Sequence, residues 1–233
     1  MSDIVIVIDW DDTLLSSCIL TIMSIIQKVG VIDIQFNPTL KLYLAQLEQS
    51  AIKLLNALKT IGTVIIVTNS ETGWVHLSCE RFMPGLLPLL IGENKIPIIS
   101  AIDLYRNRSK ALKSEFIERY TSFRGQEDGL WKYVAICTIL NNYASPVTLI
   151  SIGDSEAERS AASQIKSEIG QTALTYTSPS KVISIKFDNH PTIPGLIHQH
   201  NILLTNLKYF TRPGPIDDFK IKLPQSYVAV PIV

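Results

Sequence analysis

Carboxylates crowded directly after an apolar run are the feature of this sequence most able to do chemistry. Asp9, Asp11 and Asp12 lie within four residues, immediately after the run Ile4-Val5-Ile6-Val7-Ile8. Carboxylates held this close together repel one another unless a cation neutralises them. Hard divalent cations such as Mg²⁺ prefer oxygen ligands of this kind. The spacing therefore predicts a Mg²⁺ site at the end of a buried strand.

A second acidic group follows another apolar run, at residues 147–152. It contains Asp154, Ser155 and Glu158, and it begins at Gly153, a residue type that permits a tight turn. Asp and Ser are also ordinary helix N-caps, so either residue alone could simply begin a helix. Two acidic groups after two buried strands, however, can converge on one ion, and coincidence does not explain them together.

The elements that must position these groups alternate along the chain. Five short apolar runs have the length of strands: 4–8, 63–67, 96–100, 147–152 and 182–187. Helical patterns occupy most of the sequence between and after them: 16–29, 39–59, 74–90 with a break at Pro84-Gly85, 130–143, 155–169 and 193–210. This alternation predicts an α/β fold, a Rossmann-like three-layer sandwich with a central, mostly parallel five-stranded sheet. Ligands of such sheets bind beyond the carboxyl ends of the strands.

The order of these motifs resembles that of the haloacid dehalogenase (HAD) superfamily of phosphohydrolases. The resemblance covers roughly residues 1–190 and rests on three motifs: D-x-D-x-T at Asp9, Asp11 and Thr13; a hydroxyl residue after the next strand at Thr68; and G-D-x-x-x-[DE] at Gly153, Asp154 and Glu158. The superfamily also uses a lysine on the helix before the last of these strands. Lys132 is our choice for it, with Lys110 and Lys113 as competitors.

The resemblance implies a Mg²⁺-dependent phosphatase that works through an aspartyl-phosphate. Asp9 would be the nucleophile, and the Asp11 side chain would be the general acid and base. Mg²⁺ would be held by the Asp9 carboxylate, the Asp11 backbone carbonyl and Asp154. The metal-ligand set expected from the resemblance is therefore Asp9, Asp11 and Asp154.

The remaining site residues have lesser roles in this interpretation. Thr68, Asn69 and Lys132 would bind the phosphoryl group of the substrate. Thr13 would brace the turn after the first strand. Ser155 and Glu158 would support the metal site by holding a metal-bound water or orienting their loop.

The spacing between the motifs leaves no room for a folded cap domain, so the resemblance implies a minimal-cap or capless member. The chain is expected to form one domain over residues 1–210. Residues 15–38 would form a flap and residues 103–128 a polar insert, and a Pro-rich apolar extension would follow at 211–233. Open sites of this kind tend to accept large phosphorylated substrates, including macromolecules.

Composition excludes several other classes. Hydrophobic residues make up 46% of the chain and charged residues only 18%, so it can fill a substantial core. Lys plus Arg and Asp plus Glu both number 21, which gives no overall field for nucleic acid or an anionic membrane. Three widely spaced cysteines, Cys18, Cys79 and Cys137, argue against disulfides and zinc motifs and predict buried thiols. Without an apolar run long enough for a membrane span, these features predict a soluble, cytoplasmic protein.

Two other functions stay open: a non-enzymatic scaffold with the same fold, and a phosphotransferase of the same superfamily. The apolar tail at residues 227–233 could dock a protein partner, which favours the scaffold. His198 and His200, two positions apart, are expected on a helix surface rather than in a metal site. Trp74 either lines the pocket mouth or packs in the core.

Overall fold

The computed structural model describes residues 3–23, 25–27, 30–31, 38–108, 123, 126–171, 176–211 and 217–224. The other residues lie outside this part of the chain, and with them Lys110, Lys113, most of the expected polar insert and the apolar C-terminal tail.

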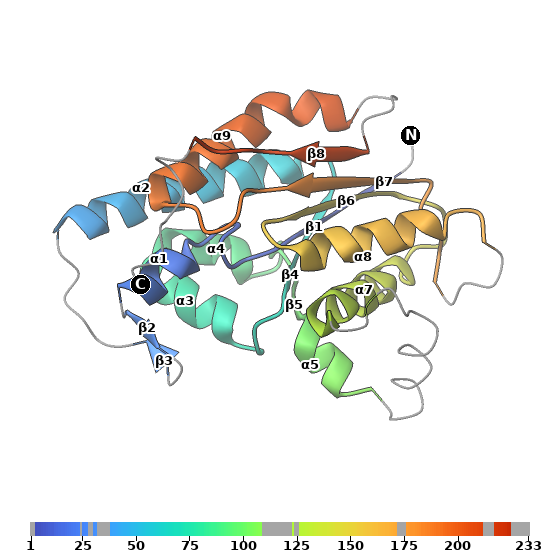
Figure 1. Ribbon diagram of the computed structural model, residues 1–233, viewed down its shortest axis with the longest axis horizontal. Coiled ribbons are helices and arrows are strands. Elements are labelled where there is room, and N and C mark those ends of the chain that lie inside the picture. The colour runs from blue at the N-terminus through green and yellow to red at the C-terminus, as the bar shows by residue number, and fades with distance from the viewer. Residues whose placement is uncertain are drawn as a thin grey trace.

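A six-stranded parallel sheet forms the centre of the molecule (Figure 1). Its strand order is β5-β4-β1-β6-β7-β8, with bounds Ile98–Ser100, Thr63–Thr68, Ile4–Ile8, Thr148–Gly153, Lys181–Lys186 and Asp218–Lys220. The α/β prediction is confirmed, but the sheet has six strands rather than five. The sixth strand, β8, pairs parallel with β7 and lies in the segment expected as an extension. Its three residues, Asp-Phe-Lys, contain no apolar run that could have identified it.

Helices cover both faces of the sheet, which gives three layers (Figure 1). On one face, α2 (Pro38–Lys59) and α9 (Ile193–Phe210) pack together and share a core with Ile6 and Ile8. On the other, α7 (Glu127–Leu140) and α8 (Glu156–Ser167) pack over Val5 and Val7. Successive residues of β1 point to opposite faces, so its continuous apolar run is buried on both sides.

The helices agree with the sequence prediction except near the N-terminus and at residues 101–106, which form a helix that was not predicted. The expected break at Pro84 separates α3 (Trp74–Phe82) from a 3₁₀ turn (Pro84–Leu86) and α4 (Leu87–Leu90), and α5 (Ala101–Arg106) follows β5. The prediction that 16–29 is mostly helical was wrong. Helix α1 (Ser17–Ile22) is followed by β2 (Ile26–Gln27), which pairs antiparallel with β3 (Gly30–Val31). Among the described helices, none combines the length and apolar character that a bilayer crossing requires.

The register of the sheet brings three strand ends together. Ile8 at the end of β1 pairs with Ile66 of β4 on one side and with Ile152 of β6 on the other. Residues that follow β1, β4 and β6 therefore emerge at the same edge of the sheet. This edge carries the acidic groups that the sequence singled out.

Candidate functional site

Three buried carboxylates converge at this edge. Asp9 follows β1, Asp154 follows β6, and Glu158 lies in the first turn of α8. One oxygen from each lies within 4.8 Å of the others. The backbone N–H of Asp9 donates to the carbonyl of Ile152 at 2.9 Å, so sheet pairing continues up to the site and fixes the two strand ends relative to each other.

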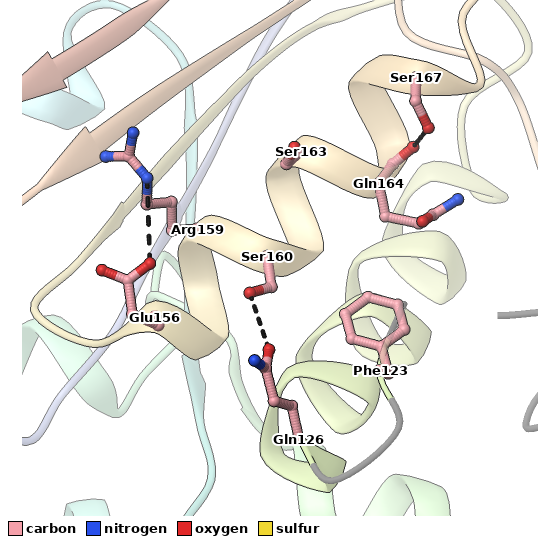
Figure 2. A pocket seen from close by; sticks show the side chains of 8 residues that line it. All are labelled: Phe123, Gln126, Glu156, Arg159, Ser160, Ser163, Gln164 and Ser167. Carbon is pink, nitrogen blue, oxygen red and sulfur yellow. Dashed lines mark hydrogen bonds and ion pairs between the residues drawn. The ribbon is translucent and has the colours of Figure 1, made fainter. Parts of the chain in front are cut away.

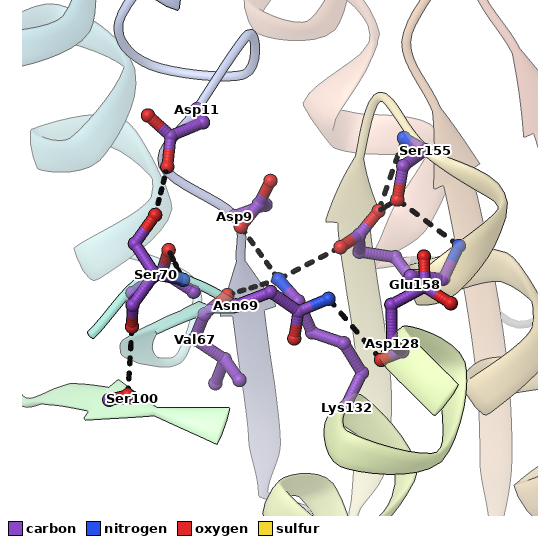
Figure 3. Close-up of polar contacts among 12 residues, drawn as sticks. Asp9, Asp11, Val67, Asn69, Ser70, Ser100, Asp128, Lys132, Ser155 and Glu158 are labelled. Carbon is purple, nitrogen blue, oxygen red and sulfur yellow. Dashed lines mark hydrogen bonds and ion pairs between the residues drawn. The ribbon is translucent and has the colours of Figure 1, made fainter. Parts of the chain in front are cut away.

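Lys132 joins two of these carboxylates. Its ammonium donates to Asp9 Oδ1 at 2.6 Å, lies 2.8 Å from Glu158 Oε1 and donates to the carbonyl of Val67 at 2.5 Å (Figure 3). Its side chain is only 2% exposed, so these contacts provide the compensation that a buried charge requires. Lys132 thus lies beside Asp9 and Glu158 at the candidate site. It extends from the second turn of α7, on the face that packs against the sheet.

The carboxylates carry more negative charge than the lysine can balance. Burial raises the pKa of Asp9 to about 7, although Lys132 opposes the shift, and Glu158 and Asp11 add to it. Burial, followed by the charges of Asp9 and Glu158, raises the pKa of Asp154 to about 9. A divalent cation among these oxygens would relieve the repulsion. The donor set, oxygen atoms alone, fits Mg²⁺.

Gly153 makes room for Glu158. A Cβ atom on Gly153 would lie 2.3 Å from Glu158 Cγ, which no packed side chain tolerates. Gly153 is a strand residue with ordinary backbone geometry, so the expectation that it permits a tight turn was wrong. Ser155 begins α8 with a capping box, in which its hydroxyl accepts a backbone N–H and the Glu158 side chain accepts the Ser155 N–H. Glu158 therefore caps the helix and binds Lys132 with the same carboxylate.

The Asp11 side chain is held by three other donors, and its carboxylate is not part of the cluster around Asp9. Its oxygens accept hydrogen bonds from Ser17 Oγ at 2.5 Å, Ser70 Oγ at 2.9 Å and Trp74 Nε1 at 2.9 Å. The three donors come from α1, from the loop after β4 and from the start of α3. Figure 3 shows the Ser70 contact, with Ser70 in turn bonded through its carbonyl to Ser100. Trp74 thus contacts the site and also packs against the core.

Thr68 and Asn69 lie at the end of β4 as expected. Thr68 is buried, and its hydroxyl oxygen accepts the backbone N–H of Ser70 at 3.0 Å, a contact that leaves its own O–H able to donate. Asn69 donates to the carbonyl of Asp128 at 3.3 Å. Its buried Oδ1 has no hydrogen-bond partner among the described residues. Both side chains can therefore contribute polar contacts at this edge.

Thr13 is fixed by a histidine that was expected on the surface. His200 is fully buried: Nε2 lies 2.8 Å from the carbonyl of Thr13 and Nδ1 lies 3.0 Å from Ser50 Oγ. Because a carbonyl only accepts, Nε2 must carry the proton and Nδ1 must accept from Ser50. The surface prediction for His200 was wrong, although His198 on the same helix is exposed. Thr13 is held through its backbone carbonyl, and its hydroxyl has no partner among the described residues.

Lys186 is a site residue that sequence reasoning missed. Its buried ammonium donates to the carbonyls of Asp154 and Phe187 and to Asn189 Oδ1, and so holds the turn that carries Asp154. Lys186 ends β7, and its position at the carboxyl end of a predicted strand was the signal that could have found it.

A polar hollow outside the candidate site lies along α8. Its volume is about 510 Å³, and Figure 2 shows side chains of α8 facing Phe123 and Gln126 across it. Ser160 Oγ donates to Gln126 Oε1 at 3.3 Å across this hollow. Its lining contains none of the clustered carboxylates and not Lys132, so it is separate from the candidate site.

Comparisons with protein-family models, with curated proteins and with solved structures gave no match to this chain. The geometry of the site and the motifs that form it are therefore the basis for assigning a function.

Proposed function

We propose that this protein is a Mg²⁺-dependent phosphatase of the HAD type, with Asp9 as its nucleophile. The observation that carries the proposal is the cluster of Asp9, Asp154 and Glu158 at the ends of β1 and β6, in which Asp9 and Glu158 both contact the ammonium of Lys132. Glu158 also caps α8, but a structural role alone gives no reason to bury Asp9 and Asp154 beside it. The motifs around these residues resemble those of HAD phosphohydrolases in order and spacing.

Asp9 is the residue that would attack phosphorus. Lys132 binds Asp9 Oδ1, so we assign the attack to Oδ2. The new bond joins Oδ2 to phosphorus while the bond from phosphorus to the ester oxygen breaks, and that oxygen leaves with a proton from Asp11. Asp11 then takes a proton from water as the water attacks phosphorus, which releases phosphate and restores Asp9.

The other site residues would orient Asp9, bind the phosphoryl group and hold the metal ion. All three N–H groups of Lys132 have partners within the protein, so Lys132 contributes its positive charge and the orientation of Asp9 rather than a direct bond to substrate. Thr68 would donate its hydroxyl proton to a phosphoryl oxygen. Asp9, Asp154 and the backbone carbonyl of Asp11 would hold Mg²⁺. A bound Mg²⁺ would neutralise the charge of the transferring phosphoryl group.

The test is hydrolysis of p-nitrophenyl phosphate and of a panel of small phosphates and phosphopeptides, with Mg²⁺ and after EDTA. We expect Mg²⁺-dependent release of phosphate from at least one of them. Ca²⁺ should support it poorly, because a larger ion with more ligands would draw both oxygens of Asp9 into coordination. Asp9→Asn should lower turnover by several orders of magnitude while keeping the fold. Asp3→Asn, an exposed carboxylate just before β1, is the matched control and should keep wild-type turnover.

A trapping experiment separates this mechanism from direct attack by water. Acid quenching during turnover, followed by mass spectrometry, should find a phosphate adduct on the peptide that contains Asp9. Hydroxylamine should remove the adduct, since it cleaves acyl phosphates. Activity that survives EDTA or Asp9→Asn would contradict the proposal, and the absence of turnover on every substrate would favour the scaffold.

A further inference from the structure

A second group of metal-ligand side chains lies beside the turn that follows β1. It consists of Asp12, Cys18 and His190, whose ligand atoms all lie within 4.8 Å of one another. Asp12 and Cys18 belong to the turn and to α1, whereas His190 belongs to the loop after β7. We infer that these three side chains form a binding site for a transition-metal ion of the Zn²⁺ class. The inference does not depend on the proposed phosphatase activity.

The three ligand atoms lie close enough together to share one ion. Asp12 Oδ1 accepts the backbone N–H of Cys18 at 2.9 Å, and Asp12 Oδ2 faces His190 Nδ1 at 3.8 Å. That separation is too long for a hydrogen bond. It is close to the roughly 3.4 Å that separates nitrogen and oxygen ligands on one tetrahedral Zn²⁺ ion. A small closure of the His190 side chain would therefore complete the coordination.

The loop after β7 already contacts the start of α1 through hydrogen bonds. The carbonyl of Pro191 accepts a hydrogen bond from Ser16 Oγ at 3.0 Å and one from Cys18 Sγ at 3.5 Å. The ligands are thus preorganised, and little chain entropy remains to be lost on binding. The His190 side chain is 65% exposed, which gives an ion a path from solvent.

The side chains of Asp12, Cys18 and His190 favour a different metal from the Mg²⁺ proposed at Asp9. Thiolate and imidazole ligands favour Zn²⁺ and related ions, whereas the carboxylates of Asp9, Asp154 and Glu158 favour Mg²⁺. Burial and the neighbouring Asp12 carboxylate raise the pKa of the Cys18 thiol, so an ion that binds there must displace the thiol proton to solvent. Three protein ligands leave the fourth position of a tetrahedral ion to water.

Titration with Co²⁺ tests this site on the full-length protein under anaerobic conditions. Co²⁺ bound to a thiolate gives a near-ultraviolet charge-transfer band that oxygen ligands do not give, so the carboxylate cluster is silent in this measurement. We expect the wild type to develop the band at one equivalent. Zn²⁺ should abolish it, because Zn²⁺ binds such sites more tightly than Co²⁺, and excess Mg²⁺ should not.

Variants decide which residues bind. Cys18→Ser should remove the band, while Cys79→Ser and Cys137→Ser, at the two buried free thiols, should keep it. His190→Gln should weaken Co²⁺ binding at least about tenfold, and its exposed position should preserve the fold, which circular dichroism checks. Asp154→Asn should keep the band. No band in the wild type, a band that survives Cys18→Ser, or equal losses in Asp154→Asn and His190→Gln would overturn the inference.

Discussion

The indole nitrogen of Trp74 donates a hydrogen bond to Asp11 Oδ1 at 2.9 Å. The bond is one end of a chain that reaches into the core. Ser78 Oγ donates to the carbonyl of Trp74 at 2.7 Å and accepts the indole N–H of Trp10 at 2.9 Å. The first turn of α3 thereby fixes the residue proposed as the general acid and base. Trp74 is a positioning residue in this arrangement, because it acts through Asp11.

Trp74→Phe should lower turnover while leaving KM nearly unchanged. Phenylalanine keeps the aromatic packing but removes a hydrogen bond to a carboxyl group, an interaction worth roughly 1.5–3 kcal/mol, or about 10–150-fold in rate if lost in the transition state. Trp131→Phe, at a half-buried tryptophan on α7, is the matched control. Steady-state kinetics with p-nitrophenyl phosphate would measure both variants. Equal turnover in the two would show that Ser17 and Ser70 position Asp11 without the indole.

Gly153→Ala should destabilise the protein by displacing Glu158. The new methyl group would overlap the Glu158 side chain, and such overpacking costs about 1–3 kcal/mol. Urea denaturation would give the free energy of unfolding of Gly153→Ala, Glu158→Ala and the double variant. Glu158→Ala removes the atoms that clash, so the two changes should be strongly non-additive, with a smaller loss in the double variant than the sum. Additive losses would show that Gly153 acts independently of Glu158.

The main features of the fold were predictable because hydrophobic burial controls them. The run Ile4-Val5-Ile6-Val7-Ile8 is apolar at every position because helices cover both faces of β1, and the same pattern identifies the neighbouring strands. Strand β8 escaped prediction because an edge strand needs no continuous apolar run. The pairing of β2 with β3 escaped because two-residue strands have no period to detect.

The candidate site was predictable in its location but not in its contacts. The rule that ligands bind beyond parallel strand ends placed Asp9, Thr68 and Asp154 together. Lys132, on the helix before β6, was chosen from the resemblance to HAD phosphohydrolases. No comparable rule predicts which side chains distant in the sequence contact each other. Helical spacing could not show that His200 contacts the backbone carbonyl of Thr13, because the two residues are 187 positions apart in the sequence.

Asp11→Asn and Asp154→Asn should separate catalysis from metal binding. The Asp11 side chain binds Ser17, Ser70 and Trp74, so Asp11→Asn should leave Mg²⁺ affinity nearly intact. It should lower turnover by roughly 10²–10⁴-fold through loss of acid–base help. Asp154→Asn should weaken Mg²⁺ binding first, because Asp154 belongs to the carboxylate cluster. Calorimetric Mg²⁺ titration and turnover of both variants provide the measurement. Equal losses of Mg²⁺ affinity would make the Asp11 carboxylate a ligand and refute its assigned role.

The buried His200 should make stability depend on pH in the acid range. Burial lowers its pKa to about 4, against the opposing effect of the Thr13 carbonyl, whereas an unfolded histidine titrates near 6.5. Between these values the unfolded chain binds the proton that the folded protein excludes, so stability rises with pH. The contribution of neutral His200 to the free energy of unfolding is complete above about pH 6.5. It is lost as pH falls toward 4, a change on the order of 3 kcal/mol.

His200→Gln tests this dependence, because glutamine can still donate to the Thr13 carbonyl but does not titrate. The free energy of unfolding of the wild type and the variant should be measured by urea denaturation from pH 4 to 7. Carboxylates also titrate in this range, so the informative quantity is the difference between the two curves. The wild type should lose more stability on acidification than the variant does. His198→Gln, at an exposed position on the same helix, should follow the wild type. Parallel curves for wild type and His200→Gln would mean that the folded protein admits a proton on His200 near neutral pH.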